Sequence, residues 1–401
     1  FAFPIGSATA IKRVAEDRSV EMGGPDRACV AWIEFTTGIN RNLHLSSTTD
    51  GGQTWSTPVS FPVSILVDDA AGFAVRSVPG VAEDTVHVAV VAPRVSGQRL
   101  RPVLYTSTDS GRTFGAPVVI SQATDIELSQ DLDLEVAGET VHLSWLGFQF
   151  PSSIRSVFYQ RSDDGGATWL PQDLRVDDPG TIGTRANGLD MAVDNGLVSV
   201  GFSATSPGSE ARLFIDTVSS SATSFGADLQ LGQPAGALAG PQFIRNDADG
   251  GGVMVTPSGR VVAAWIEENT FGTFQAVVAI SQGVNQVFSQ QVLFPTGFQL
   301  GSAEHVELVS GEDGSVHVVV STSGPDQRLA FQSLDGGLLF NPSVTLLPQG
   351  SFAFRGNHSE VAVAHSSTYR NLMVARPSFS FTDNNSNLGS MTVTGYRSAT
   401  I

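Results

Sequence analysis

Five arginines in this 401-residue chain recur at similar places, at or just before short apolar segments. They are Arg18, Arg76, Arg185, Arg245 and Arg355, and three of them have an asparagine one or two residues further on: Asn187, Asn246 and Asn357. Convergent guanidinium groups hold a carboxylate or a sulfate by bidentate, charge-assisted hydrogen bonds. The arginines, with Asn187 and Asn357, therefore predict a binding site for an anionic group. The alternative is that each arginine pairs with a nearby acid, such as Asp17, Asp131 or Asp249.

Carboxyl and imidazole side chains occupy the same parts of the chain. Glu34 and Glu267 end two near-identical segments, Ala-Trp-Ile-Glu, while Asp131, His305 and His358 stand where other apolar segments begin. Two carboxylates about 5–10 Å apart can act as the catalytic pair of a glycosidase, and a histidine can abstract a proton in a lyase. These five residues are the catalytic candidates, and a structural or solvated role is the alternative for each.

A second set of acids occupies what align as the innermost strands of a repeat. The set comprises Glu21, Asp133, Asp190, Glu307 and Glu360. Four of them have apolar neighbours on both sides, and Glu360 has one, Val361, so alternation along a strand places the five carboxylates on one face. Like charges so close together would raise one another's pKa values unless they are compensated. They could accept backbone N–H groups of a neighbouring sheet, pair with the arginines, or bind a hard cation such as Ca²⁺. No cofactor is required by the sequence, and Ca²⁺ is the one ion it suggests.

A short phrase repeats through the chain and identifies the elements that must carry these residues. The pattern S/T-x-D-x-G-x-T-W/F begins at Thr48, Ser107 and Ser162, and a degenerate copy begins at Ser333. An aspartate followed by glycine suits a tight hairpin turn, because the carboxylate accepts backbone N–H groups and glycine adopts positive φ. The closing Trp or Phe would pack under the turn. Two further copies have degenerated, near Ser219–Phe225 and Ser281–Phe288.

This phrase resembles the Asp-box, or bacterial neuraminidase repeat, of sialidase-like β-propellers. The resemblance covers nearly the whole chain and implies that the turns lie on the face away from the ligand site. Members of that superfamily include glycosidases, lyases, sugar binders and assembly factors. The sialidase catalytic set does not carry over: the nearest match to the F/Y-R-I-P phrase is Val75–Pro79, with one extra residue. None of the four tyrosines, Tyr105, Tyr159, Tyr369 and Tyr396, stands where a nucleophile would be needed.

The repeats predict an all-β, seven-bladed propeller of four-stranded antiparallel blades, formed by residues 1–401 as one domain. Aligned second strands have steps of about 55–63 residues and place seven residues in register: Trp32, Val90, Trp145, Phe202, Trp265, Val320 and Arg376. The last unit has three strands, Ser359–Ala364, Leu372–Arg376 and Ser390–Tyr396, and the segment Ala2–Val14 is predicted to supply its outer strand. Six blades with a terminal appendage are the alternative.

The amino-acid composition excludes some classes of binding partner. The net charge of −17 argues against nucleic acid and anionic membranes, which require a basic surface. No segment reaches the roughly 18–20 apolar residues of a membrane span. The single cysteine, Cys29, lies in an apolar segment and is expected to be a buried small hydrophobe. Because the chain begins at Phe1, we expect a removed export signal and a secreted, periplasmic or cell-surface location, and a monomer.

These observations predict an exported, sialidase-like propeller that acts on an acidic or decorated glycan as a hydrolase or a lyase, without strict sialidase activity. The alternative is a non-catalytic propeller that binds a glycan or a protein. A multivalent lectin would repeat aromatic stacking platforms in every unit. Here the repeated aromatic residues belong to the turns and the second strands, where they are expected to form the core.

Overall fold

The computed structural model describes most of the chain. The described residues are 2–5, 20–24, 26–35, 41–63, 73–91, 99–123, 126–152, 154–178, 185–205, 211–231, 243–244, 251–268, 274–281, 288–292, 301–310, 315–324, 326–333, 335, 340, 344–347, 360–365, 369–381 and 387–399. Within these ranges every regular element is a β-strand. The described part of the chain therefore contains no helix that could cross a membrane.

The chain divides into two compact units. The first comprises Phe1–Leu143, Gln160–Asp173 and His358–Ile401, and the second comprises Ser144–Tyr159 and Leu174–Asn357. Residues of one sheet, β10–β13, are divided between the two units.

Three sheets belong to the first unit. One is β2 (Val20–Met22), β3 (Ala28–Phe35), β4 (Arg41–Thr48) and β5 (Val59–Val63). The next is β6 (Phe73–Val78), β7 (Thr85–Val91), β8 (Pro102–Ser107) and β9 (Val118–Val119). The third joins the two ends of the chain, in the order β1 (Ala2–Ile5), β29 (Asn387–Ala399), β28 (Tyr369–Phe381) and β27 (Glu360–His365).

Four further sheets complete the described residues. The sheet shared between the units contains β10 (Ile126–Ala137), β11 (Thr140–Gln149), β12 (Arg155–Ser162) and β13 (Leu174–Arg175). In the second unit, one sheet contains β14 (Arg185–Asp194), β15 (Leu197–Thr205), β16 (Ala211–Ser219) and β17 (Leu229–Leu231). The next contains β18 (Phe243–Ile244), β19 (Gly251–Val255), β20 (Val261–Glu268), β21 (Phe274–Ile280) and β22 (Ser289–Val292). The last contains β23 (Gly301–Ser310), β24 (Val316–Gly324), β25 (Asp326–Ser333) and β26 (Val344–Leu347).

The strand pairs whose register the structure defines are antiparallel, and five of the seven sheets of the described residues pair their strands strictly in chain order. One departure from the four-stranded prediction lies in the sheet of β18–β22. There β18 and β19 both pair with β20, which gives that sheet five strands rather than four.

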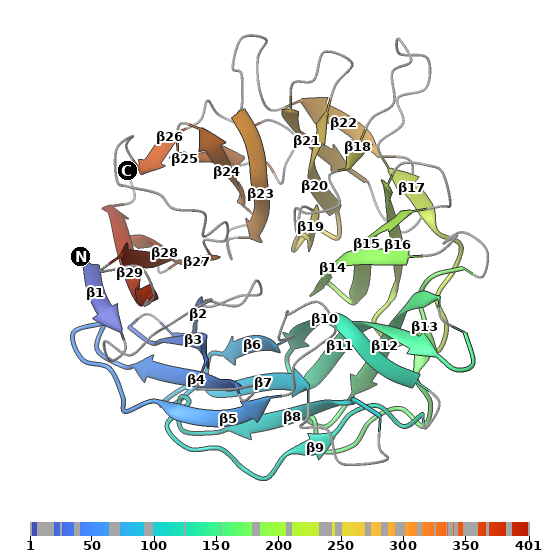
Figure 1. The fold of residues 1–401 in the computed structure, drawn as a ribbon, viewed down its shortest axis with the longest axis horizontal. Helices are drawn as coiled ribbons and strands as arrows, with labels where there is room; N and C mark the ends of the chain where they lie inside the picture. The colour runs from blue at the N-terminus through green and yellow to red at the C-terminus, as the bar shows by residue number, and fades with distance from the viewer. Residues whose placement is uncertain are drawn as a thin grey trace. The chain divides into compact units, whose positions relative to one another are not determined.

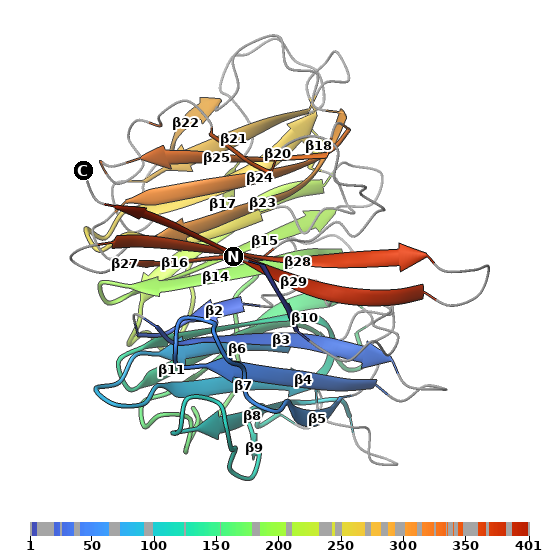
Figure 2. The same ribbon diagram turned by 90° about the vertical axis from the view of Figure 1, so that its left-hand side faces the viewer.

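The N-terminal strand completes the last sheet, as predicted. Ala2–Ile5 pairs antiparallel with β29, and Phe3 lies opposite Val393. Figure 1 shows β1 beside β29, although the two strands come from opposite ends of the chain. Figure 2 shows β28 and β29 as two long neighbouring strands; both are longer than the segments predicted from the sequence.

The strands form because they are rich in β-branched and aromatic residues that are buried on both faces. β7 reads Thr-Val-His-Val-Ala-Val-Val, and all but its first residue are buried. One core cluster packs the sheet of β2–β5 against the sheet of β6–β9, and it includes Leu43, Leu45, Phe61 and Val88. Cys29 is buried in the same cluster as a free thiol, and burial raises its pKa well above the ordinary value.

The repeated phrase forms the same hydrogen-bonded turn in its three intact copies. In the second copy the Asp109 carboxylate accepts hydrogen bonds from the backbone N–H of Thr113 (2.9 Å) and from its hydroxyl (2.6 Å). The Ser107 hydroxyl donates to Asp109 (2.7 Å) and accepts the N–H of Gly111 (2.9 Å). The copies at Asp50 and Asp164 repeat these bonds within 0.2 Å. Each phrase therefore closes its own turn.

Each intact turn is also tied to the connection between the first and second strands. The N–H of the residue after the aspartate donates to a carbonyl there: Gly51 to Asp26 (2.8 Å), Ser110 to Asp84 (3.0 Å) and Gly165 to Glu139 (2.8 Å). All three of these donors have positive φ. Glycine suits this conformation, and Ser110 is the one copy that adopts it with a side chain.

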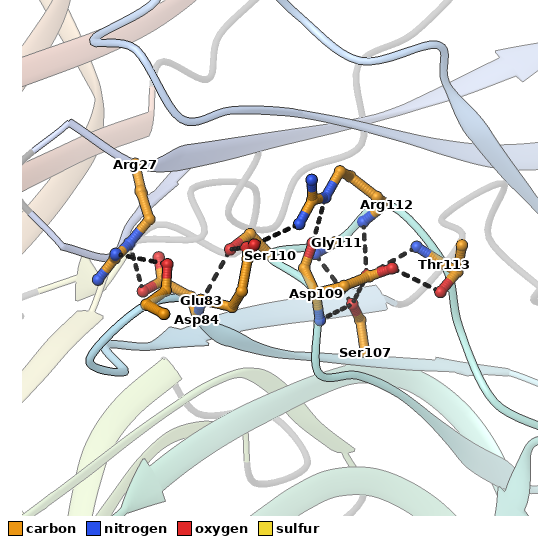
Figure 3. Close-up of polar contacts among 10 residues, drawn as sticks. Arg27, Glu83, Asp84, Ser107, Asp109, Ser110, Gly111, Arg112 and Thr113 are labelled. Atoms are coloured by element: carbon orange, nitrogen blue, oxygen red, sulfur yellow. Dashed lines mark hydrogen bonds and ion pairs between the residues drawn. The ribbon is translucent and has the colours of Figure 1, made fainter.

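That side chain extends the network in the second copy (Figure 3). The Ser110 hydroxyl donates to Glu83 (2.7 Å) and accepts the N–H of Asp84 (2.9 Å). Glu83 also pairs with Arg112, and the buried Asp84 pairs with Arg27 (2.7 Å) from the connection between β2 and β3. The network therefore links the turn to the neighbouring sheet.

The closing aromatic residues pack as predicted. Phe114 meets Phe61 of the preceding sheet edge to face, with 4.9 Å between ring centroids. In the second unit Phe225, which closes a degenerate copy, meets the buried Tyr159 in the same way at 5.1 Å. The aromatic position thus fastens one sheet to the next, even where the aspartate is missing.

Candidate functional site

A local backbone irregularity recurs in the first strands of three sheets. In β10, Asp131 has φ of 24°, a conformation that costs energy for a residue with a side chain. In β14, Gly188 has φ of 70° and the register shifts there, between Asn187 and Leu189. In β23 the register shifts between Ala303 and His305. Bulges of this kind redirect side chains and are common beside functional sites. Two of the predicted catalytic residues, Asp131 and His305, lie at these positions.

A cluster of charged side chains lies on the first strands of the first unit. Arg76 of β6 donates to Glu21 of β2 through Nη1 (2.6 Å). It binds Glu135 of β10 in a bidentate manner, through Nη2 (2.6 Å) and Nε (3.0 Å). Asp133 lies 3.7 Å from the same Nη2. All four side chains are at least four-fifths buried. Three sheets are therefore joined through one guanidinium group.

This cluster determines what Arg76 can do. Its three side-chain nitrogens all bond within the protein, and Nη1 also donates to the carbonyl of Val75. An anionic ligand would have to displace a carboxylate to reach it. Arg76, predicted as a ligand-binding residue, therefore serves the fold in this structure. Glu135, which the sequence analysis did not single out, is its main partner. The alternation Asp131, Asp133, Glu135 along β10 was the available signal.

The negative charges of the predicted acidic set are compensated in two of the three predicted ways, by an arginine and by a backbone N–H group. Glu21 and Asp133 meet Arg76, while Asp190 of β14 accepts the backbone N–H of Val253 from β19 at 2.5 Å. The pairing register of the first and second strands shows which of these acids occupy equivalent positions. Asp190, Glu307 and Glu360 pair with Gly201, Val319 and Ala375, each one residue before an aligned second-strand position.

Glu21 departs from this register. It pairs with Cys29, which is three residues before Trp32, so it lies two residues further along its strand than the set was predicted to lie. It is instead level with Arg76, which pairs with His87, three residues before Val90. This explains why the two side chains meet. Among the residues that the structure describes, no group of three His, Cys, Asp or Glu is arranged to hold a metal ion.

The remaining predicted residues divide into two groups. Glu34 and Glu267 lie within β3 and β20 rather than after them, opposite Asn42 and Gln275. The structure gives the backbone but not the side chains of these two, of Arg185, Asn187 and His305, and of Glu307 and Glu360. Arg18, Arg245, Asn246, Arg355, Asn357 and His358 lie outside the described residues.

Histidines and tyrosines of the repeat serve the core. His87 contacts the Thr106 hydroxyl (3.1 Å), and burial lowers its pKa to about 4. Burial and, secondarily, Arg161 lower the pKa of His142 to about 3. Tyr159 is buried against Phe225, and Tyr105 packs on Phe61. Tyr159 is therefore too buried to act as a nucleophile, whereas Tyr105 is partly buried.

The connection between β11 and β12 was not anticipated. Phe150 and Ile154 are about two-fifths exposed, and the turn is closed by a hydrogen bond from Ser152 N–H to the Gln149 carbonyl (2.8 Å). The buried Arg155 lies over the ring of Phe148, 5.7 Å from its centroid. The sequence Phe-Gln-Phe-Pro at 148–151 was the available signal. Aromatic faces of this kind can stack on sugar rings.

Comparison with known proteins gives the fold. No family model matches the chain, and neither does any curated protein sequence. Solved structures do match. A PL25 ulvan lyase bound to -[GlcA(1-4)Rha3S]- has a TM-score of 0.60 and 11% identity, over 97% of this chain and 95% of that one. This is the β-propeller fold. The polysaccharide lyase Uly1 has a TM-score of 0.52 at 11% identity, over 96% of this propeller and 90% of that chain.

The endosialidase of phage phi92 also has a TM-score of 0.52 at 11% identity, over 99% of this propeller and 68% of that chain. The propeller is thus similar in fold to sialidase-like and polysaccharide-lyase proteins. Sequence identities of 11% show the fold but not the reaction, because one fold supports many activities.

Proposed function

We propose that this propeller is a carbohydrate-active protein that acts on an anionic glycan, as a polysaccharide lyase or a glycoside hydrolase, outside the cell or at its surface. The observation that carries the proposal is the likeness, over nearly the whole chain, to a lyase bound to a glycan of glucuronate and sulfated rhamnose. Carboxylate and sulfate are the groups that the recurring arginines predict. With Arg76 engaged in the fold, Arg18, Arg185, Arg245 and Arg355 are the proposed ligand-binding arginines.

The proposed chemistry centres on the first-strand irregularities. In a lyase, a base removes the proton at C5 of the uronate while the bond from C4 to the leaving oxygen breaks, which leaves a C4–C5 double bond. Asp131 in the first unit and His305 in the second are proposed separately, each as a candidate base, since each lies at a local backbone irregularity. Glu34 and Glu267 remain candidates for the carboxylate pair of a hydrolase, and His358 remains a candidate for the base of a lyase. Strict sialidase activity is not proposed, because Tyr159 is buried in the core and the partly buried Tyr105 packs on Phe61.

The test is a substrate screen with matched variants. Ulvan, other uronate polysaccharides, aryl glycosides and aryl sialosides are incubated with the purified protein, and unsaturated uronate absorbance and reducing ends are measured. We expect turnover of a uronate polysaccharide, and a loss of at least about 100-fold in Asp131→Asn or His305→Gln. Asp163→Asn, on an exposed turn, is the control that should retain full activity.

A folded protein that is silent on every substrate rules out the enzyme. In that case affinity electrophoresis in the same polysaccharides tests the second candidate, a non-catalytic glycan binder. The exposed Phe150 beside the Arg155–Phe148 contact is the observation that favours it.

A further inference from the structure

Two neighbouring sheets offer a matched pair of buried positions. Tyr159 of β12 pairs with Leu174, the first residue of β13, and Ile215 of β16 pairs with Leu229, the first residue of β17. The residues that follow in the two third strands, Gln160 and Asp216, are therefore equivalent. Asp173 and Asp228 are equivalent in the same way, since each immediately precedes the outer strand. Gln160 and Asp216 are both completely buried.

In the sheet of β10–β13 the acid is fully provided with donors. Gln160 Nε2 donates to Asp173 Oδ1 (2.8 Å), and the Ser121 hydroxyl donates to Oδ2 (2.6 Å). The backbone N–H of Gln122 adds a third bond (3.2 Å). A buried amide donor and an ionised acid form a stable pair.

In the sheet of β14–β17 an acid replaces that amide. Neither carboxyl oxygen of Asp216 has a hydrogen-bond partner, although both are buried. The N–H groups of Gly226 and Thr217 lie near enough to favour its ionised form, but neither makes a bond of acceptable geometry. Asp228 and Asp178 meanwhile hold each other's backbone, through Asp178 N–H to Asp228 Oδ2 (3.0 Å) and Asp228 N–H to Asp178 Oδ2 (3.2 Å).

The surroundings of Asp216 favour its neutral form. Burial and, secondarily, the charge of Asp228 raise the pKa of Asp216 to about 6, and Asp178 acts in the same direction. Arg175 of β13 pairs with Asp177 (2.6 Å), which also accepts the N–H of Val157 (2.7 Å). Neither oxygen of the Asp216 carboxyl group has a hydrogen-bond donor, and a second carboxyl group lies beside it. Binding one proton would supply the missing donor and remove the repulsion.

We propose that Asp216 is protonated in the folded protein at mildly acidic pH and donates its hydrogen to Asp228. The pair then reproduces the Gln160–Asp173 bond. The bond between Asp216 and Asp228, here called the latch, would then hold β16 to the turn before β17 at low pH, while Asp178 and Asp228 join that turn to the connection after β13.

The direction of the pH effect follows from proton linkage. Between the unfolded value of 3.8 and the folded value of about 6, the folded protein binds more of this proton than the unfolded chain does. The latch therefore contributes its full stability below about pH 4 and loses it as the pH rises through about 6. At pH 8 the ionised Asp216 is a buried charge that accepts no hydrogen bond, and it destabilises the fold.

The test compares the melting temperatures of the wild-type protein and Asp216→Asn from pH 4 to pH 8. Asparagine matches the protonated acid in shape and supplies a permanent donor. We expect equal melting temperatures near pH 4, and a variant that melts roughly 2–4 °C higher at pH 8. Taking the difference between the two proteins removes the contributions of His87 and His142. The control, Asp173→Asn at the equivalent but satisfied position, should melt lower at pH 8.

Two results would overturn the proposal. One is an Asp216→Asn variant that melts lower than wild type at pH 8 while added CaCl₂ raises, and a chelator lowers, the wild-type melting temperature, because a bound cation rather than a proton would then neutralise the acids. The other comes from the wild-type protein alone. If ¹³C NMR of the aspartate carboxyl groups finds none that titrates above about pH 5, Asp216 is ionised and the latch does not exist.

Discussion

At the scale of single residues, one guanidinium group joins three first strands. Arg76 forms ion pairs with Glu21, Glu135 and, at longer range, Asp133. Removing one partner of a buried ionic cluster leaves the others as uncompensated buried charges. Arg76→Gln should therefore lower the free energy of unfolding by about 3–5 kcal/mol at pH 7. Urea titration followed by tryptophan fluorescence measures this loss of stability.

An exposed ion pair is the control for that measurement. Arg112 pairs with Glu83 on the turn face, where both side chains are about two-fifths exposed or more. Arg112→Gln should cost less than about 1 kcal/mol, since solvent screens the pair. Equal losses in Arg76→Gln and Arg112→Gln would show that the buried cluster does not hold the first strands together.

Buried histidines set the response of the fold to acid. The pKa of His87 lies at about 4 and that of His142 at about 3, below the unfolded value of 6.5. The unfolded chain therefore binds protons first, and stability falls as the pH drops from about 6.5 toward these values. We expect the melting temperature to fall between pH 7 and pH 5, and to fall less in His87→Gln. An identical slope in the variant would contradict a buried neutral histidine.

At the scale of elements, the repeated turn depends on its aspartate. Desolvation opposes the ionised form of Asp109, but bonds from Thr113, Ser107 and Arg112 outweigh it and lower the pKa to about 2. Asp109→Asn loses the charge in each of these bonds, and we expect a loss of about 1–2 kcal/mol at pH 7. The loss should disappear below about pH 2, where Asp109 is itself protonated. Chemical denaturation of Asp109→Asn and of a control, Glu139→Gln, at an exposed position between β10 and β11, makes the comparison.

The same elements show how far the sequence carries. The turn phrase predicted three hairpins and their closing aromatic residues, because an Asp, a Gly and a Thr at fixed spacing satisfy one another locally. It did not predict that Arg76 would form an ion pair with Glu21. That pair depends on the register of β2 and β6, which sequence alone does not fix. The irregularity at Asp131 was also out of reach, because no glycine marks it. Hydrogen bonds within a turn could thus be predicted from the sequence, whereas the partners of long side chains on different strands could not.

At the scale of the whole molecule, the fold depends on pairing between the two ends of the chain. β1 contributes four residues to β29, and without them β29 would become an unprotected sheet edge. Deletion of residues 1–5 should therefore lower the melting temperature and promote association through that edge. Differential scanning calorimetry and light scattering measure the two effects.

The pairing itself can be separated from the side chains that are lost in the deletion. Thr394 lies opposite Ala2 and Val393 lies opposite Phe3. A synthetic peptide of residues 1–5, added to the truncated protein, should restore the melting temperature and return the protein to its original mass, because strand addition supplies the missing backbone hydrogen bonds. The same peptide with Phe3→Pro lacks one N–H donor and should act more weakly. A truncated protein that melts like the full chain and remains at the same mass would mean that β29 does not need this strand, and the end-to-end pairing would not be what closes the last sheet.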